Sequence, residues 1–325
     1  MNQEKKYCGV DVSSDVLDLC YQDGSGDKHH LQVSNNKKGF QQLLKSCGKD
    51  LHYVMESTGV YHMQFMFYLH ENGCVYSVVN ALQIRRYIQM HLERNKSDKK
   101  DAKRICEYGI ERHPQPSEMP DSAYFECRTI NNAIQDFTKE ITRISNQIHA
   151  LKRSGVAAQE VIKCYEKMVK KMRQEKEKLE VHLSEKLKVW QPELLSQVSS
   201  VKGIGRRAAA ELIIYTKSFK GMENYKQLIS YSGLSPVEYS SGSSIRGRTK
   251  ICKQGGKQIR HILYMCALNA KQTNRACREL FDRLVAGGKN KKSAVIAVCN
   301  KLLKQVFGCV KNGTMYQDDY AKNIA

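Results

Sequence analysis

The first 116 residues alternate short apolar runs with segments in which apolar residues recur every three or four positions. Short apolar runs are typical of buried strands, whereas the wider spacing is typical of helices with one apolar face. Strands are predicted at residues 7–12, 16–22, 28–33, 51–56 and 75–79, and helices at residues 37–47, 61–72, 81–92 and 98–112. A three-strand meander followed by two helix–strand units predicts an α/β domain over residues 1–116, in which helices cover a mixed sheet.

Residues 117–193 follow a different pattern. Apolar residues recur at steps of three and four from Ile130 to Leu151, and again from Val161 to Leu187 after a break near Gly155. Charged residues fill the intervening positions, so the pattern predicts a long antiparallel helical hairpin of the coiled-coil type. A spacer or a dimerisation arm is the simplest role for it, and its basic face could also contact nucleic acid.

Residues 194–313 are predicted to form a third, mainly helical region. Helical spacing is found at residues 194–199, 225–233, 257–273, 276–286 and 291–312, and a further helix is expected after Gly205. The tail, residues 314–325, is expected to be poorly ordered. The fold class is therefore α/β followed by all-α.

The charge of the chain adds a class of partner to this picture. The 325 residues include 53 Lys and Arg against 33 Asp and Glu, a net charge of +20, while hydrophobic residues make up 41%. This apolar content is that of a folded protein, and the excess of positive charge predicts a polyanionic partner, with nucleic acid as the default. A ribosomal protein or a structural RNA-binding protein would fit the charge equally well.

The cysteines and the N-terminal segment predict an intracellular protein. None of the 12 cysteines forms a Cys-x-x-Cys pair, so reduced, buried thiols are expected. Residues 1–6 lead into a strand rather than a signal-peptide core, and no run approaches the roughly 20 apolar residues of a membrane span. We therefore expect a cytoplasmic protein without a membrane partner.

Four acidic residues lie where an open α/β sheet places its active groups. Asp11 ends the first predicted strand, Glu56 ends the fourth, and Asp98 and Asp101 share one face of a predicted helix. Clustered carboxylates repel one another unless cations bind between them, and such hard oxygen ligands suit Mg²⁺ or Mn²⁺. Two such ions can bridge a phosphate and stabilise both the attacking and the leaving oxygen. Each acid alone has a structural alternative, since Asp11 could bond to its own turn and Asp98 could cap its helix.

A second candidate lies at residues 234–260, a stretch rich in glycine, serine and positive charge. The serines are Ser240, Ser241, Ser243 and Ser244, and the cations are Arg246, Arg248, Lys250, Lys253, Lys257 and Arg260. Glycine lets the main chain approach a phosphate backbone, to which N–H groups, hydroxyls and guanidinium groups can donate. The stretch has no apolar period, so it is predicted to be a surface loop. Its local chemistry favours phosphate-binding serines over a nucleophilic serine.

A third candidate is the turn at residues 200–206, Ser-Val-Lys-Gly-Ile-Gly-Arg. A helix, a Gly-Ile-Gly turn and a second helix resemble a helix-hairpin-helix, in which N–H groups at a helix N-terminus bind a backbone phosphate. The residues that would make the contact are Lys202, Gly203, Gly205 and Arg206. A Gly-x-Gly turn between two helices is also often only a turn.

Together these motifs resemble a known family. Gly-Val-Asp-Val-Ser at residues 9–13, Glu-Ser-Thr-Gly-Val-Tyr at 56–61 and Asn-Lys-Ser-Asp-x-x-Asp-Ala at 95–102 are similar to the RuvC-like (ribonuclease-H-like) domain of the DEDD transposases of the IS-one-ten insertion-sequence family. Residues 201–205, 231–236, 239–247 and 253–260 resemble the C-terminal transposase domain of that family. The resemblance covers about residues 7–313, in the right order.

The resemblance implies an activity and its partners. Family members are recombinases guided by a non-coding bridge RNA, one loop of which pairs with target DNA and another with donor DNA. By this resemblance, Asp11, Glu56, Asp98 and Asp101 would bind Mg²⁺. Ser241, which directly precedes Gly-Ser-Ser-x-Arg-Gly, would attack the scissile phosphate and form a covalent phosphoserine with DNA. The composite site would be shared by two protomers of a homotetramer.

Two other functions stay open at the level of sequence. A RuvC-like endonuclease would hydrolyse branched DNA with the four acids and would use the serine loop only to grip phosphate. A non-enzymatic nucleic-acid-binding protein would use the helical hairpin and the Gly-x-Gly turn, but clustered acids in a chain of net charge +20 argue against it. Within the leading interpretation, Ser240 offers a second hydroxyl that could substitute for Ser241.

Overall fold

The structure, a computed structural model, describes residues 6–22, 26–57, 59–91, 97–155, 159–237, 240–241, 245–246 and 250–318, with 240–241 and 245–246 described by their backbone. Contacts divide the chain into two compact units, Met1–Met119 and Pro120–Ala325. The predicted division placed the first boundary at residue 116 and treated the helical hairpin as a separate domain. Each unit is described by itself.

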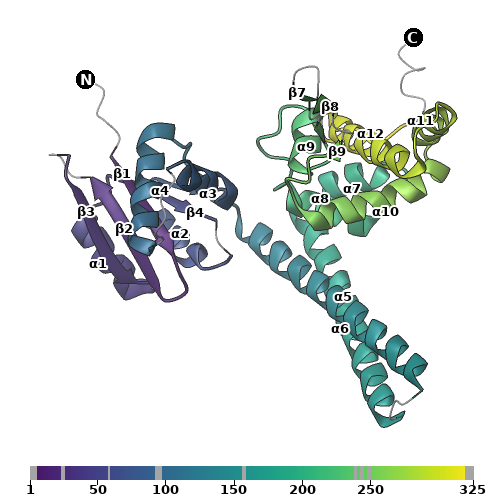
Figure 1. The fold of residues 1–325 in the computed structure, drawn as a ribbon, viewed down its shortest axis with the longest axis horizontal. Coiled ribbons are helices and arrows are strands. Elements are labelled where there is room, and N and C mark those ends of the chain that lie inside the picture. The colour runs from purple at the N-terminus through teal and green to yellow at the C-terminus, as the bar shows by residue number, and fades with distance from the viewer. Residues whose placement is uncertain are drawn as a thin grey trace. The chain divides into compact units, whose positions relative to one another are not determined.

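The N-terminal unit is built on a five-stranded sheet in the order β3–β2–β1–β4–β5 (Figure 1). Its strands are β1 (Tyr7–Val12), β2 (Val16–Gln22), β3 (Lys28–Ser34), β4 (His52–Glu56) and β5 (Tyr76–Val79). β1 pairs antiparallel with β2 and parallel with β4, while β2–β3 is antiparallel and β4–β5 is parallel. The predicted mixed sheet is therefore confirmed.

Helices cover both faces of this sheet. On one face, Phe40 and Phe65 have ring centroids 5.2 Å apart, and Phe65 meets the ring of Tyr53 edge-on at 6.0 Å. These rings join α1 (Lys37–Cys47) and α2 (His62–Glu71) to β4. The opposite face packs against α3 (Ala81–Met90) and α4 (Asp98–Arg112). A buried cluster fills that interface: Tyr7, Val54, Val79, Ile84 and Ile105.

At Gly9, the helix α4 lies very close to the sheet of this unit. A Cβ atom built on Gly9 would lie 2.1 Å from the backbone N of Cys106 and 2.4 Å from the carbonyl O of Ala102. Real Cβ atoms do not come so near to backbone, so only glycine allows α4 to lie at this distance from β1. The side chains of β1 that share this face are those of Tyr7 and Asp11, because strand residues alternate between faces.

The C-terminal unit begins with the predicted helical hairpin. Its two helices are α5 (Ser122–Ser154) and α6 (Gln159–Trp190), and Gly155 ends α5 in the left-handed conformation with φ of 71°. Between the helices lie Ile134, Ile144, Leu183 and Leu187, all nearly or fully buried.

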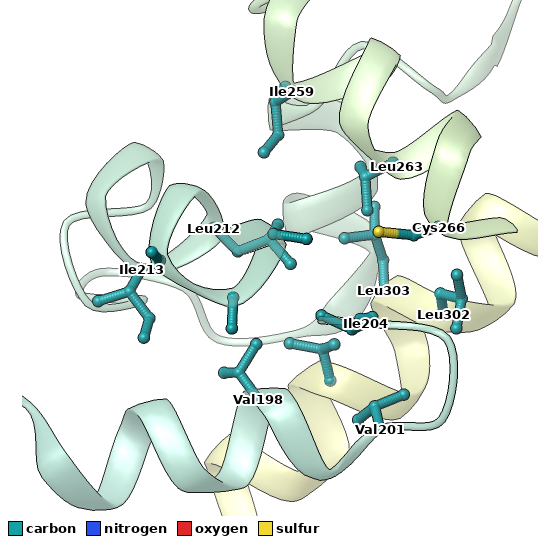
Figure 2. Close-up of a cluster of buried hydrophobic side chains, with 14 of the residues drawn as sticks. Val198, Val201, Ile204, Leu212, Ile213, Ile259, Leu263, Cys266, Leu302 and Leu303 are labelled. Carbon is teal, nitrogen blue, oxygen red and sulfur yellow. The ribbon is translucent and has the colours of Figure 1, made fainter. Parts of the chain in front are cut away.

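The remaining helices form one core with the base of this hairpin. They are α7 (Pro192–Ser200), α8 (Arg206–Tyr215), α9 (Tyr225–Tyr231), α10 (Lys257–Thr273), α11 (Arg275–Ala286) and α12 (Lys291–Asn312). Figure 2 shows side chains of α7, α8, α10 and α12 meeting in this core, with Val201 and Ile204 from the turn between α7 and α8 directed into it. Leu183 and Leu187 belong to the same buried cluster, so the hairpin is continuous with the helical core.

Within the part of the chain that the structure describes, α12 alone is long and apolar enough to cross a membrane. The sequence analysis did not expect any such segment. Val298, Leu302 and Val306 of α12 are fully buried, and half of the apolar stretch lies inside the protein. This burial is typical of the core helix of a globular protein, and it accounts for the apolar character of α12.

Four two-residue strands, which we call the β-arm, lie between residues 236 and 251, where the sequence predicted a surface loop. β6 (Pro236–Val237) pairs antiparallel with β9 (Lys250–Ile251), and β7 (Ser240–Ser241) pairs antiparallel with β8 (Ile245–Arg246). Strands of two residues are too short to show an alternating apolar pattern, which explains why the pairing was not predicted.

Candidate functional site

Asp11 and Glu56 lie side by side at one edge of the N-terminal sheet. Val10 of β1 is in register with Met55 of the parallel strand β4, so the next residues, Asp11 and Glu56, are level with each other. Both belong to the face on which Gly9 meets α4, because each lies an even number of residues from the Gly9–Val54 pair. Both side chains are half-buried. Sequence reasoning placed these two acids together at strand ends, and the structure agrees on that placement.

The first turn of α4 carries the other two predicted acids. Ala102, Ile105 and Gly109 face the sheet, and Asp98 and Asp101 extend the same stripe of the helix toward its N-terminus. Ser97 caps this end, and its hydroxyl accepts a hydrogen bond from the N–H of Lys100 at 3.4 Å. Asp101 is half-buried and Asp98 is exposed.

The donor set fits a hard divalent cation in its chemistry, but its side chains are not gathered. Carboxylate oxygens from two adjacent strand ends and one helix turn are the ligands that such ions prefer. Among the described residues, however, no three Asp, Glu, His or Cys side chains lie close enough together to hold a metal ion. Thr58 and residues 92–96, which flank Glu56 and α4 in the chain, lie outside the described residues.

A fifth acid, which the sequence analysis did not single out, lies next to this edge. Asp18 is directly opposite Asp11 across the β1–β2 ladder and is only 4% exposed. Its two carboxylate oxygens lie 3.0 Å from Nε2 of His30 and 3.0 Å from Nε2 of Gln32. Like charges opposite each other in a sheet are unfavourable, so these two partners offset the cost of a second carboxylate beside Asp11. The sequence could have pointed to Asp18, because it is a charged residue within the apolar run Val-Leu-Asp-Leu-Cys.

Two thiols lie on the same face as these acids. Cys20 is in register with Gly9, and it forms a buried cluster with Ala102 and Cys106 of α4. The hydrogen bond with Cys106 stabilises the Cys20 thiolate and lowers the pKa of Cys20 to about 7. The same contact, together with burial, raises the pKa of Cys106. Both cysteines are free thiols, as predicted.

The predicted nucleophile lies in the β-arm of the C-terminal unit. The backbone of Ser241 pairs with Ile245, and Ser240 pairs with Arg246. Ser241 is therefore the last residue of β7. Ser243, Ser244 and Arg248, which were predicted to contact phosphate, lie outside the described residues.

The base of the β-arm is held by residues that the sequence assigned to phosphate binding. Arg260 of α10 donates through Nη1 to the carbonyl O of Gly255 at 2.9 Å and to that of Ser232 at 3.4 Å. This gives Arg260 a structural role at the arm. Lys253 and Lys257 are exposed beside it.

The Gly-x-Gly turn joins α7 to α8 as predicted, and its inner residues are fixed by packing. Gly203 has φ of 102°, and a Cβ atom there would lie 2.5 Å from that of Ala270. The N–H of Gly205 contacts the thiol of Cys266, whose pKa burial raises to about 11. Arg206, at the first position of α8, is exposed, and no side chain caps this helix end.

Comparison with known families finds a transposase model for each of these two parts of the chain. The model of the DEDD transposase of IS110, described as a transposase, matches residues 8–153, and the model of the transposase IS116/IS110/IS902 family matches residues 195–282. The two matches cover the acidic edge of the sheet and the serine-bearing arm in one chain. The chain belongs to the IS110 family of transposases. This transposase is therefore a DNA-acting enzyme of transposition and recombination, and its DEDD family implies a divalent metal cation.

Proteins similar to this transposase include two pilin gene-inverting proteins and a protein of an insertion element. The transposase is 26% identical over 330 residues to a pilin gene-inverting protein of Moraxella bovis, covering 94% of this chain and 96% of the relative. A pilin gene-inverting protein of Moraxella lacunata matches to the same extent. An uncharacterised protein of the insertion element IS110 from Streptomyces coelicolor is 28% identical over 120 residues, which is 37% of this chain and 29% of that protein.

Proposed function

We propose that this transposase is an RNA-guided DNA recombinase that acts through a covalent phosphoserine at Ser241. The proposal assigns a metal-binding role to Asp11, Glu56, Asp98 and Asp101, with Mg²⁺ or Mn²⁺ as the ion. It also assigns a ribonuclease-H-like (RuvC-like) fold to the N-terminal unit and a helix-hairpin-helix to α7 and α8.

The strongest support for the assignment of the four acids is the position of Asp11 and Glu56. Asp11 and Glu56 are level at the ends of two adjacent parallel strands, on the face against which α4 packs. The helix that packs there carries the remaining two acids in its first turn. Carboxylates from three separate segments of the chain thus lie on elements that meet at one edge of one sheet. Closure of the first turn of α4 onto that edge would complete a cation site.

The proposed chemistry conserves phosphodiester bonds. The Oγ atom of Ser241 would attack the scissile phosphorus, so that an Oγ–P bond forms while the bond from phosphorus to the departing deoxyribose oxygen breaks. The hydroxyl proton of the serine ends on the departing oxygen. In the reverse step, a deoxyribose hydroxyl of the partner strand attacks the phosphoserine and releases Ser241. When bound, Mg²⁺ supplies Lewis-acid polarisation of the phosphate.

The β-arm suits this role because it presents the serine near its end. Positive groups on the arm and beside it, including Lys250 and Lys253, would neutralise the charge that develops on the phosphate oxygens. No water is consumed in either step, so strands can be exchanged without an external energy source.

The proposal includes two partners beyond DNA. A non-coding bridge RNA would pair with target and donor DNA, and its backbone would meet part of the net charge of +20. The acids and Ser241 belong to different units, which suits a composite site shared by two protomers of a tetramer. Strand exchange that proceeds equally well without RNA transcribed from the flanking DNA would contradict the guide.

A RuvC-like endonuclease is the second candidate, with the serines as phosphate ligands. The relatives named pilin gene-inverting proteins favour the recombinase, because inverting a segment of DNA requires the cut strands to be rejoined. A hydrolytic enzyme does not rejoin strands. The same family models would fit either chemistry in the acidic domain, so the decision rests on Ser241.

Trapping the covalent complex tests the proposal. Labelled junction DNA is incubated with the transposase and its RNA, denatured, and resolved by mass to detect protein joined to DNA. We expect the adduct with the native chain and with Ser240→Ala, and its loss with Ser241→Ala. If Ser241→Ala still cleaves DNA, the serine is a phosphate ligand and the endonuclease hypothesis is correct. If Ser240→Ala alone loses the adduct, the nucleophile is the neighbouring hydroxyl.

A further inference from the structure

The chain after α12 returns to the turn between α7 and α8. Tyr316 donates its backbone N–H to the Oγ atom of Ser200 at 2.8 Å. Its hydroxyl donates to Oδ1 of Asn274 at 3.2 Å. Asn274 is fully buried, and its Nδ2 donates to the carbonyl O of Lys202 at 3.1 Å. The segment and the turn are therefore joined through a partly buried hydrogen-bond network.

This network places one carboxylate against the lysine of the turn. Asp318, two residues after Tyr316, forms an ion pair with the ammonium group of Lys202. Burial and the neighbouring Asp318 carboxylate raise the pKa of the Tyr316 hydroxyl to about 12, so this hydroxyl stays protonated as a donor. One oxygen of Asp318, Oδ1, is buried and lacks a hydrogen-bond partner among the described residues. The carboxylate is thus held at Lys202 by the ion pair and by its contact with Tyr316.

Between Val201 and Gly205, the side chain of Lys202 is the one that extends into solvent. Val201 is fully buried and Ile204 is 4% exposed, and both point into the core (Figure 2). The side chain of Lys202, in contrast, is 53% exposed. A carboxylate at Lys202 occupies the place that an anionic oxygen of a DNA backbone would take. A carboxylate and a phosphodiester carry the same charge, and both accept from an ammonium group.

We propose that Asp318 is an intramolecular substitute for phosphate, which holds Lys202 in the free protein and is displaced by duplex DNA. The inference rests on the proposed helix-hairpin-helix contact with DNA. It adds that Asp318 pairs with Lys202 when no DNA is bound. An ion pair between two partly exposed side chains contributes little free energy, so a DNA backbone can replace it. The pair would weaken binding to arbitrary duplexes and favour DNA that engages the rest of the protein.

Four variants of the full chain separate this role from a general effect of charge. Asp318→Asn removes the competing charge, and Lys202→Ala removes the cation. The double variant combines both changes. Asp282→Asn, at an exposed position on α11, raises the net charge by the same amount and serves as the matched control. Thermal unfolding of each variant verifies the fold. Affinity for a labelled 20-base-pair duplex is measured by fluorescence anisotropy at physiological salt.

We expect Asp318→Asn to bind the duplex about two- to five-fold more tightly than the native chain, within the range that an exposed ion pair allows. Asp282→Asn should gain less, and when Lys202 is already alanine Asp318→Asn should gain no more than Asp282→Asn does. A gain of Asp318→Asn that keeps its full size without Lys202, or that only equals the gain of Asp282→Asn in the native background, overturns the inference while leaving the contact intact. If Lys202→Ala binds as the native chain does, the hairpin contact itself is wrong. A gain seen with a structured RNA but not with the duplex overturns the assignment of DNA as the competitor.

Discussion

At the scale of single residues, Gly9 sets the position of the helix that carries two of the four acids. Its missing side chain lets the backbone of α4 lie against β1 near Ala102 and Cys106. Asp18 has a complementary role, because it fills the place opposite Asp11 and is held by His30 and Gln32. Neither residue is one of the four acids, yet both shape the surroundings of Asp11.

Gly9→Ala should separate α4 from the sheet. The added methyl group cannot be accommodated without moving backbone, and overpacking of this kind costs about 1–3 kcal/mol of the free energy of unfolding. Thermal or denaturant unfolding of the N-terminal unit measures this loss, and DNA cleavage should fall with it. Gly308→Ala in α12 is the matched control, since a Cβ atom there meets nothing within 4 Å. Equal stability of the two variants would contradict the close approach at Gly9.

At the scale of elements, α4 links the acidic edge to the core through its first turn. The residues of α4 that pack against the sheet run from Gly109 back to Ala102. Asp98 and Asp101 lie on the same side of the helix, one turn closer to its N-terminus. The cap at Ser97 keeps this turn helical, so the capping residue controls where the two carboxylates lie. In the C-terminal unit, backbone pairing of β7 with β8 fixes the position of Ser241.

Ser97→Ala should loosen the first turn of α4. Loss of a side-chain cap costs about 1 kcal/mol, because the hydrogen bond to the N–H of Lys100 is lost. Hydrogen exchange should become faster at Lys100 and Asp101 and stay unchanged near Gly109. DNA cleavage should then require a higher concentration of Mg²⁺. Ser97→Asp keeps a capping oxygen and should behave as the native chain, so equal exchange in Ser97→Ala and Ser97→Asp would argue against the cap.

At the scale of the whole molecule, binding and chemistry draw on different charges. Positive side chains outnumber acidic ones by 20 across the chain, and they favour any nucleic-acid backbone. The proposed chemistry instead depends on a few carboxylates in the N-terminal unit. The two functions should therefore respond differently to added salt and to removal of divalent cations.

Chelation of divalent cations should stop DNA cleavage and leave DNA binding in place. Affinity should still fall steeply as monovalent salt rises, because phosphate contacts release condensed counterions. Cleavage and anisotropy measured in parallel test both statements, with the chelator pre-saturated by Mg²⁺ as the control. Cleavage that continues unchanged in excess chelator would refute the role of the four acids, and an affinity that is insensitive to salt would refute phosphate-dominated binding.

The sequence by itself determined the helices, the five strands of the N-terminal sheet and the two acids at the sheet edge. Periods of two and of three to four residues are local properties of a strand and a helix, so the limits of β1, α1, α10 and α12 could be read directly. The positions of Asp11 and Glu56 followed, since each directly ends a buried run. The helical hairpin was equally plain, because its apolar series breaks near Gly155, which ends α5.

Only the tertiary structure decided which distant residues meet. The register that sets Asp18 against Asp11 depends on strand pairing, and the two-residue strands of the β-arm exist only as pairs. The pairing of Lys202 with Asp318 joins side chains 116 residues apart. Such contacts arise from packing of whole elements, and a local pattern of apolar and polar residues carries no information about them.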